Sequence, residues 1–379
     1  MAPLRKVYHL IIFFTIIVFL WLGVWTHSKV RPAHTKEVIN LSDSTAETFP
    51  KKKVLIYAAT MFSKHPIGHG DLKMCSAEVK NYCTISSDLE DLPNADGVLF
   101  HSREFDENKM NNFTEAHDRN PEIPYVMMAL ECPFYTRLHK YRDFFNWTMT
   151  YRSDSDVHQP YGKLVKRTEK VIVDYDKIWK SKTKTAFWLV SNMYSTGNRR
   201  KELVEKMVKE GLKVDLRGKL YGVPVGCARE QIKQTCEIEL HRPYKFTMAF
   251  ENNNCKEYVT EKFWYKMLKF QMVPIVMTRK IYRDLGIPDS MFIAVDDFGS
   301  LKEAVAHVQS VASNKTAYLE YHKWREDFRI IDMNEDDFGY CQLCRKLSEF
   351  QGTPKKSYEN LKSWFNTSDC DNSFADKHL

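Results

Sequence analysis

Short apolar runs that alternate with helical patterns constrain the fold of this chain most strongly. The runs begin at Val54, Gly97, Tyr125, Ala186, Phe246 and Met272. They are short and lack strict alternation, which predicts strands buried on both faces, as in parallel sheets. Residues 199–210 have a helical pattern with Leu203 and Met207 near one face, and a strand-like run follows at 213–216. Repeated strand–helix–strand units predict a doubly wound α/β fold.

The length of the chain predicts two domains. Its 379 residues, 43% of them hydrophobic, are enough for two cores of ordinary size. A polar stretch at 180–184 suggests a boundary near 180, with one domain over 51–180, another over 181–350, and a C-terminal segment over 351–379. The net charge is +7, and the Lys and Arg residues form no dense block. It suits an anionic substrate or a membrane surface and does not indicate nucleic acid.

The N-terminus predicts a membrane anchor. Residues 7–26 contain no Asp, Glu, Lys or Arg, and a helix of this length can cross a bilayer. A cleaved signal peptide is the alternative, but the apolar stretch is long for one and no small-x-small site follows. We therefore expect a cytosolic tail over 1–6, a retained signal anchor over 7–26 and a stem over 27–50.

Sequons and cysteines predict that the body of the protein is lumenal. Five N-glycosylation sequons are spread along the chain, at Asn40, Asn112, Asn146, Asn314 and Asn366. Nine cysteines suit an oxidising compartment, and their odd number leaves at least one unpaired within the chain. Cys341 and Cys344 form a CxxC pair that suits zinc or redox chemistry as well as disulfides. No second such pair accompanies it, which favours disulfides.

The densest polar pattern follows the apolar run at Phe246. Asn252 lies just beyond it, where ligands bind in doubly wound folds. Thr260 is a candidate cap for the next helix, which puts Lys262 in the first turn. A cation there is disfavoured by the helix dipole, and a phosphate held by Lys262 and the helix amides would resolve the conflict. Glu261 suits sugar hydroxyls. The alternative is a solvated surface pair of Glu261 and Lys262.

This stretch resembles the signature of the α1,3-fucosyltransferases, inverting enzymes that use GDP-fucose. The signature reads approximately Lys-Phe-x-x-x-Phe-Glu-Asn, Asp/Glu-Tyr-x-Thr-Glu-Lys and Val-Pro-x-Val. The matching residues are Lys245, Phe246, Phe250, Glu251, Asn252, Glu257, Tyr258, Thr260, Glu261, Lys262, Val273, Pro274 and Val276. The resemblance implies a fold of the GT-B type, with two facing Rossmann-like domains. It also implies that Asn252, Tyr258, Glu261 and Lys262 hold the nucleotide sugar.

Further segments extend the resemblance. A Val-Ser-Asn element followed by Arg199 implies that this arginine contacts the diphosphate; the alternative is one more charge on an exposed helix face. Glu131, followed by Cys132 and Pro133, resembles the family's Glu-Ser-Pro element. This implies that Glu131 is the base that takes the proton from the acceptor hydroxyl. The alternative for Glu131 is the capping of a turn.

Disulfide pairing and metal use are also implied by the resemblance. Cys75 and Cys83 are expected to bridge to Cys341 and Cys344. Cys227 and Cys236 are candidates to close a loop in place of a disulfide that relatives have. The family carries the Asp-x-Asp found at residues 154–156 without a metal role. We therefore expect no obligatory metal, with stimulation by a divalent cation such as Mn²⁺ left open.

Two positions limit these expectations. The family's His-His-Arg-Asp element is His101-Ser-Arg-Glu104 here, so acceptor contacts can differ. The sequon at Asn146 lies inside a family motif and can be buried and unmodified.

Together these features predict a type II enzyme of the Golgi membrane. It would transfer fucose from GDP-fucose, in α1,3 linkage and with inversion, to N-acetylglucosamine of a glycoprotein glycan. The acceptor would be the N-glycan core or a Lewis-type antenna. A catalytically silent Golgi protein that binds glycans or nucleotide sugars on the same scaffold is the alternative. The intact set Glu131, Tyr258, Glu261 and Lys262 favours the enzyme.

Overall fold

The computed structural model describes residues 53–62, 65–67, 69–103, 107–136, 141–192, 196–223, 235–333 and 338–379. Residues 52–379 form one compact unit. The expected tail, anchor and stem, with Asn40, lie outside the described residues, as do Glu104 and Cys227. Within the described ranges no helix is long and apolar enough to cross a bilayer.

A six-stranded sheet organises the first part of the chain, and all its neighbouring strands are parallel. In spatial order its strands are β4 (Cys83–Ser86), β1 (Val54–Ala58), β5 (Gly97–His101), β6 (Tyr125–Ala129), β7 (Trp147–Thr150) and β8 (Val157–His158). Along the chain the sheet starts with β1. The next strand, β4, lies on one side of β1 and all later strands lie on the other side, which is a doubly wound order. A separate hairpin consists of β2 (Met61–Phe62) and β3 (His65–Pro66).

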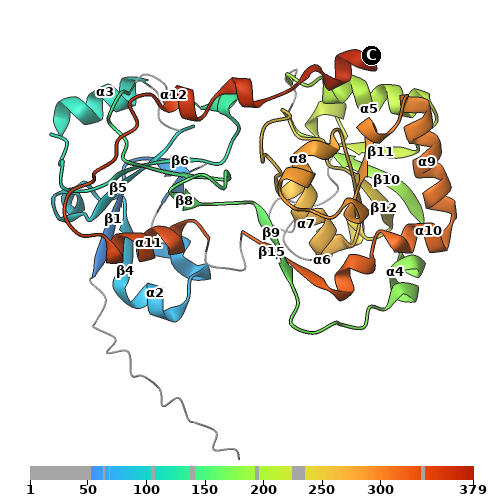
Figure 1. The fold of residues 1–379 in the computed structure, drawn as a ribbon, viewed down its shortest axis with the longest axis horizontal. Helices are drawn as coiled ribbons and strands as arrows, with labels where there is room; N and C mark the ends of the chain where they lie inside the picture. Colours follow the sequence, from blue (N-terminus) through green and yellow to red (C-terminus); the bar gives the residue numbers. More distant parts are fainter. Residues whose placement is uncertain are drawn as a thin grey trace, which may run out of the picture. The chain divides into compact units, whose positions relative to one another are not determined.

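Both faces of this sheet are buried. Ile56 and Met128 point to a core shared with α2 (Ala77–Tyr82) and α11 (Tyr340–Glu349). Phe100 and Met127 point to the opposite core, which includes side chains of α3 (Glu107–Ala116) and α12 (Leu361–Trp364). Figure 1 shows these helices above and below the strands. Burial on both faces explains why the strands lack alternation, and the predicted parallel α/β architecture is confirmed.

A five-stranded sheet organises the second part and is again entirely parallel. In spatial order its strands are β11 (Val214–Arg217), β10 (Lys184–Leu189), β12 (Tyr244–Met248), β13 (Val273–Val276) and β14 (Ile293–Ala294). Its helices are α4 (Tyr175–Ser181), α5 (Arg200–Lys209), α6 (Thr235–His241), α7 (Glu261–Phe270), α8 (Arg279–Asp284), α9 (Leu301–Ser313) and α10 (Lys315–Glu320). Buried residues of α5 and α9 pack on one face with Phe246, and those of α7 and α8 pack on the other with Val276 (Figure 1).

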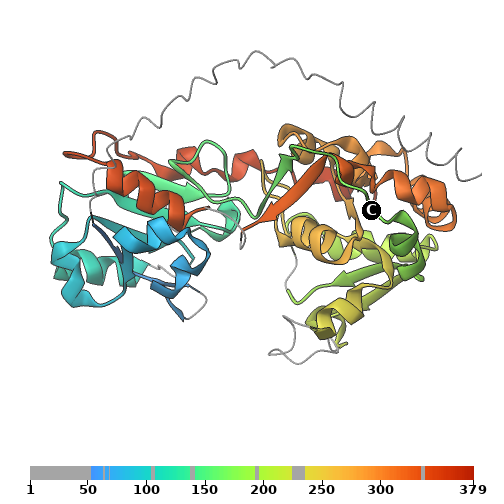
Figure 2. The ribbon, with the colours of Figure 1, turned by 90° about the horizontal axis from the view of Figure 1, so that it is seen from below.

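The chain crosses between the sheets twice through a two-stranded antiparallel ribbon. Its strands are β9 (Gly162–Lys166) and β15 (Phe328–Asp332), which Figure 2 shows side by side. Gly162 allows close packing here, because a Cβ atom at this position would lie 2.4 Å from Cγ of Trp264.

The predicted range 181–350 for the second domain is wrong at both ends. Ile178 of α4 is already in the core of the second sheet, and the polar stretch near 180 is the end of α4 and the start of β10. At the other end, Leu343 and Leu347 of α11 lie in the core of the first sheet. An amphipathic pattern predicts that a helix buries one face, but it does not say against which sheet.

Two disulfides hold α11 on the first sheet region. Cys75 bonds to Cys341 and Cys83 bonds to Cys344, so α11 is joined to the first sheet region by the four cysteines that the resemblance singled out. Cys236 is also disulfide-bonded, but its expected partner lies outside the described residues. A further disulfide that the sequence did not suggest joins Cys255 to Cys370.

The C-terminal segment after α11 contacts both sheet regions. Leu361 and Phe365 lie in a core of the first sheet, and Phe374 lies in a core of the second. Between them, Cys370 is bonded to Cys255.

The sequons differ in exposure. Asn146 is 4% exposed, and its amide donates to the Lys356 carbonyl and accepts from the Tyr125 N–H. This fold therefore leaves no room for a glycan on Asn146. Asn112 and Asn314 are exposed.

Candidate functional site

The site lies where the winding direction of the second sheet changes, between β10 and β12. Loops that leave the carboxyl ends of these two strands diverge there and leave a crevice for ligands. The loop after β10 leads to Arg199 and α5, and the loop after β12 carries residues 249–260 to α7. The region that the sequence pattern singled out is therefore at the expected crevice.

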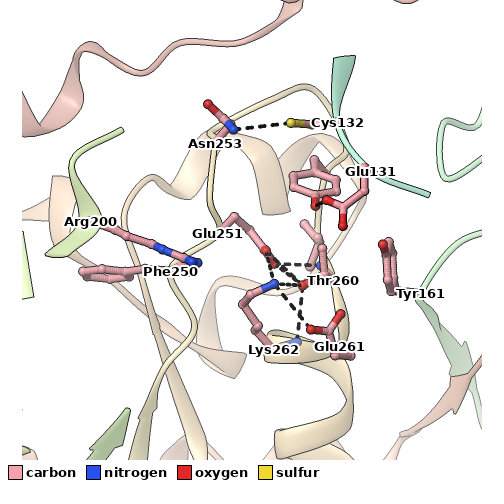
Figure 3. A network of polar contacts seen from close by, with 12 residues as sticks. Glu131, Cys132, Tyr161, Arg200, Phe250, Glu251, Asn253, Thr260, Glu261 and Lys262 are labelled. Carbon is pink, nitrogen blue, oxygen red and sulfur yellow. Dashed lines mark hydrogen bonds and ion pairs between the residues drawn. The ribbon is translucent and has the colours of Figure 1, made fainter. Parts of the chain in front are cut away.

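A partly buried ion pair lies at the start of α7 (Figure 3). Glu251 is 5% exposed, and its carboxylate accepts from the Thr260 N–H and Oγ1, both at 2.8 Å, and from Lys262 Nζ at 3.0 Å. Lys262 Nζ also donates to Thr260 Oγ1 at 2.8 Å. Burial lowers the pKa of Lys262, but the carboxylates of Glu251 and Glu261 outweigh it and hold that pKa above its usual value. The ammonium is therefore charged and its position is fixed.

Thr260 is the N-cap of α7, as predicted: its Oγ1 accepts from the Lys262 N–H at 3.4 Å. The helix thus begins beside Lys262, and its first amides and the ammonium provide positive potential at one place. Glu261 begins the helix with its side chain 56% exposed, and Lys262 Nζ lies 3.4 Å from its carboxylate. Glu261 is available to solvent, whereas Glu251 is not. The interpretation of Glu261 and Lys262 as a solvated pair omits Glu251, which is the closer partner of the lysine.

Glu131 follows β6 and faces the loop after β12. Its carboxylate accepts from Tyr258 Oη at 2.9 Å and from Arg103 Nη1 at 3.0 Å, and 27% of its side chain is exposed. The next residue, Cys132, is the N-cap of the following turn. Glu131 therefore bonds to side chains of other segments, and the turn-capping alternative is wrong.

Two tyrosines hold this carboxylate and its backbone in place. Tyr258 is 2% exposed, and burial raises its pKa well above the usual value, so its hydroxyl remains a donor to Glu131. Tyr161 Oη donates to the Leu130 carbonyl at 2.7 Å, and its ring packs against that of Tyr258. Residues 130 and 131 are thereby fixed from two directions.

The loop between Asn252 and Tyr258 contains an unused acceptor. Asn252 Oδ1 is buried and has no hydrogen-bond partner among the described residues. Glu257 has φ 58°, in the left-handed region, and its carboxylate accepts from the Ser153 N–H at 2.6 Å. A buried carbonyl oxygen without a donor is costly unless a ligand or water supplies one.

Two adjacent arginines at the start of α5 have different surroundings. Arg199 has φ 50° and pairs with Asp376 at 3.0 Å, with 45% of its side chain exposed. Arg200 is 5% exposed, donates to the Phe250 carbonyl at 2.9 Å and interacts electrostatically with Glu251. Figure 3 shows the Arg200 side chain near Phe250 and Glu251. Burial lowers the pKa of Arg200 below its usual value.

Arg200 and Glu251 lie in the candidate site and were not predicted there from the sequence. A signal for Arg200 was present, because it falls in phase with Leu203, Val204 and Met207 on the buried face of α5. Arg199, one position earlier, falls outside that face.

The Asp-x-Asp pair is used within the fold. Arg152 pairs with Asp154 at 2.5 Å, and Lys356 pairs with Asp156 at 3.0 Å. In the part of the chain that the structure describes, no group of three or more His, Cys, Asp or Glu side chains could hold a metal ion.

Comparison with known proteins identifies the family. The fucosyltransferase N-terminal model matches residues 50–162, and the C-terminal model of glycosyltransferase family 10 (fucosyltransferase) matches residues 179–364. The α-(1,3)-fucosyltransferase fut-5 of Caenorhabditis elegans is 52% identical over 336 residues, which is 88% of each chain. The chain belongs to glycosyltransferase family 10. The gap between the two family models contains most of β9 and the first residues of α4, so it agrees with the crossing seen in the fold.

Other family 10 relatives support the same assignment. The α-(1,3)-fucosyltransferase fut-6 of Caenorhabditis elegans is 39% identical over 376 residues, 97% of this chain and 95% of fut-6. Among solved structures, an α1,3-fucosyltransferase crystallised with GDP-fucose superimposes with a TM-score of 0.51 at 14% identity, over 83% of this chain and 95% of that one. At that identity the likeness shows a shared fold.

Proposed function

We propose that this family 10 protein transfers fucose from GDP-fucose, in α1,3 linkage and with inversion, to N-acetylglucosamine of a glycoprotein glycan. One observation carries the proposal: the partly exposed Glu131 carboxylate is hydrogen-bonded to Tyr258, which belongs to the same loop as the cation site at α7. A base and a site for an anionic leaving group are thus adjacent. The names of the relatives, all α-(1,3)-fucosyltransferases, supply the linkage and the donor.

The donor site would be built from the residues that the signature implies. Lys262 and the first amides of α7 would hold the diphosphate. Asn252 Oδ1, which has no donor among the described residues, would accept from a hydroxyl or amine of the nucleotide. Glu261 would accept from hydroxyls of the donor, and Tyr258 would line the site between donor and base.

A second cation would come from α5. Arg199 would have to exchange Asp376 for the diphosphate, and both side chains are partly exposed. Arg200 needs no such exchange, because it donates its hydrogen bond to a neutral carbonyl. A buried guanidinium with free N–H groups suits two phosphates. We therefore include Arg200 in the donor site beside the expected Arg199.

Transfer would proceed in one displacement. Glu131 takes the proton from the acceptor hydroxyl, whose oxygen bonds to the anomeric carbon of fucose as the bond to the β-phosphate oxygen breaks. GDP leaves with its electron pair and an added negative charge. Lys262, Arg200 and the α7 amides stabilise that charge, so no protonated acid is needed on the leaving group.

We further propose that the two sheets are the two facing Rossmann-like domains of a GT-B enzyme in the Golgi membrane. The apolar stretch 7–26, the disulfides and the exposed sequons support a lumenal body. No obligatory metal is proposed, and stimulation by Mn²⁺ remains to be tested.

An acceptor panel tests the reaction. The full-length chain, solubilised in detergent, is given GDP-fucose with N-glycans and lactosamines, and the linkage of any product is determined by mass spectrometry. We expect α1,3-fucosylated product from the wild type and none from Glu131→Ala or Lys262→Ala. GDP-fucose binding without any product would favour the silent scaffold. Absence of GDP-fucose binding would overturn the donor assignment.

A further inference from the structure

A cavity of about 250 Å³ lies beside the loop that carries Glu131, and the donor site does not use it. Pro133, Phe134 and Thr136 line it from the loop after β6, and Leu361 and Phe365 line it from the C-terminal segment. The cavity therefore belongs to the first sheet region, on the same side of the reaction as the proposed base.

Phe134 lines the cavity and is half exposed. It is 50% exposed, whereas Phe365, which lines the same cavity, is 5% exposed. The core is complete without the ring of Phe134. An exposed aromatic face at a cavity is well suited to the apolar C–H face of a sugar, because the face is apolar and carries negative partial charge.

The polar groups of the cavity suit a hydroxyl-rich ligand. Thr136 Oγ1 is buried and has no hydrogen-bond partner among the described residues, and rotation about χ1 can turn this hydroxyl. Lys362 and Thr367 add an exposed ammonium and an exposed hydroxyl to the lining, and no described residue adds a carboxylate. An apolar wall with a few hydroxyl and amine groups matches the two faces of a sugar ring.

The position of the cavity indicates that its ligand would belong to the acceptor glycan. Phe134 is three residues after Glu131, so their Cα atoms are at most about 11 Å apart. In the proposed reaction the attacking hydroxyl lies at Glu131, and the rest of the acceptor glycan must extend away from it. We propose that this cavity is an acceptor subsite for a sugar ring other than the one that receives fucose. This inference depends on the proposed function.

Matched variants test the subsite. Phe134→Ala removes the ring, Thr136→Val removes the hydroxyl, and Leu89→Ala is the control, because Leu89 is also 50% exposed and does not line the cavity. The acceptors are β-methyl N-acetylglucosaminide, N-acetyllactosamine and a paucimannose N-glycan. We expect Phe134→Ala to lower kcat/KM for an oligosaccharide acceptor by about 2- to 12-fold, the range for an aromatic contact. A smaller fall is expected for Thr136→Val. The monosaccharide acceptor, the KM for GDP-fucose and the Leu89→Ala variant should be unaffected.

Two results would overturn the subsite. An equal loss on the monosaccharide and the oligosaccharides would mean that Phe134 acts through Glu131, and no loss on any acceptor would mean that the cavity is unused. Glycan binding is measured in parallel by saturation-transfer NMR. A wild type that binds glycan without turnover contradicts the proposed function. In that case, weaker glycan binding by Phe134→Ala would still show that the cavity holds a sugar, and unchanged binding would show that it does not.

Discussion

At the residue scale, the two arginines at the start of α5 differ in burial: Arg200 is buried, whereas Arg199 is partly exposed. If Arg200 holds the diphosphate, Arg200→Lys keeps the charge but loses the planar fork that binds two phosphates. We expect GDP to bind about 10-fold more weakly and GMP to change little, since hydrogen bonds to charged groups contribute about 1.5–3 kcal/mol. Isothermal titration with both nucleotides measures the difference. Arg199→Lys is the adjacent control and should change the GDP affinity less.

An equal loss of GDP and GMP affinity in Arg200→Lys would mean that Arg200 only supports the Phe250 carbonyl. A larger loss of GDP affinity in Arg199→Lys would mean that the exposed Arg199 holds the diphosphate, which requires it to release Asp376.

Glu131 gives the second prediction at this scale. Glu131→Gln keeps an oxygen that can accept from Tyr258, but it cannot take a proton. We expect kcat to fall by about 10²- to 10⁴-fold while the affinity for GDP stays unchanged, because Glu131 bonds to Arg103 and Tyr258 and to no donor-site cation. Steady-state rates at saturating GDP-fucose, together with GDP titration, measure both. A kcat within a few-fold of the wild type would show that another group is the base.

At the element scale, α7 links the site to the far side of the second sheet. Its N-terminus carries Lys262, and its last carbonyls accept from two basic side chains: the buried Lys182 donates to Phe270 at 2.6 Å, and the partly buried Arg325 donates to Met267 at 2.9 Å. Cations suit a helix C-terminus for the same reason that anions suit its N-terminus. The helix is therefore held at one end by protein charges and left open at the other for a ligand.

The contact between α6 and α7 gives a pH prediction. His241 is 0% exposed and stacks on Phe270, with ring centroids 4.5 Å apart. Burial, and then the charge of Lys266, lower its pKa to about 3. The unfolded chain binds a proton near pH 6.5 and the folded chain does not, so stability falls as pH drops below 6.5. This residue should cost about 1.4 kcal/mol of unfolding free energy at pH 5.5.

Denaturant unfolding of the wild type and of His241→Gln between pH 8 and pH 5 measures this effect. We expect the unfolding free energy of the wild type to fall relative to that of the variant as pH falls. A stability difference that stays constant across this range would show that His241 is not the source.

Prediction from sequence succeeded where the determinant was local. The helix after Thr260 has its predicted cap and buries Phe263, Trp264 and Met267, because capping and periodicity depend on neighbouring residues. It failed for α11, because this helix packs on β1, more than 200 residues earlier in the chain. Arg200 was missed because two adjacent arginines look alike until the phase of the helix distinguishes them.

At the scale of the whole molecule, the site depends on loops from both sheets. Glu131 follows a strand of the first sheet and Tyr258 follows a strand of the second, and their hydrogen bond is 2.9 Å long. The C-terminal segment fixes the second of these loops. Asn372 Nδ2 donates to Asn253 Oδ1 at 2.9 Å, and Cys370 is bonded to Cys255. Nine cysteines allow many pairings, so this connection could not be read from the sequence.

Removal of the Cys255–Cys370 disulfide tests whether the segment keeps the site in place. The bond closes a separation of 115 residues, and we expect the Cys255→Ser/Cys370→Ser variant to lose about 2–4 kcal/mol of stability. GDP binding should weaken too, because the loop carries Asn252 and Tyr258. The thiol of Cys132 is free, buried and in contact with Asn253 of this loop, so its rate of labelling by a thiol reagent should rise.

The Cys75→Ser/Cys341→Ser variant is the control, since that disulfide joins α11 to the first sheet region and does not touch the loop. It should lower the unfolding temperature while GDP affinity and Cys132 labelling stay near wild-type values below that temperature. If both variants weaken GDP binding equally, global destabilisation explains the loss. If only the Cys255–Cys370 variant does so, the C-terminal segment acts on the site through the loop, and the two sheets need this connection to bring Glu131 to the donor.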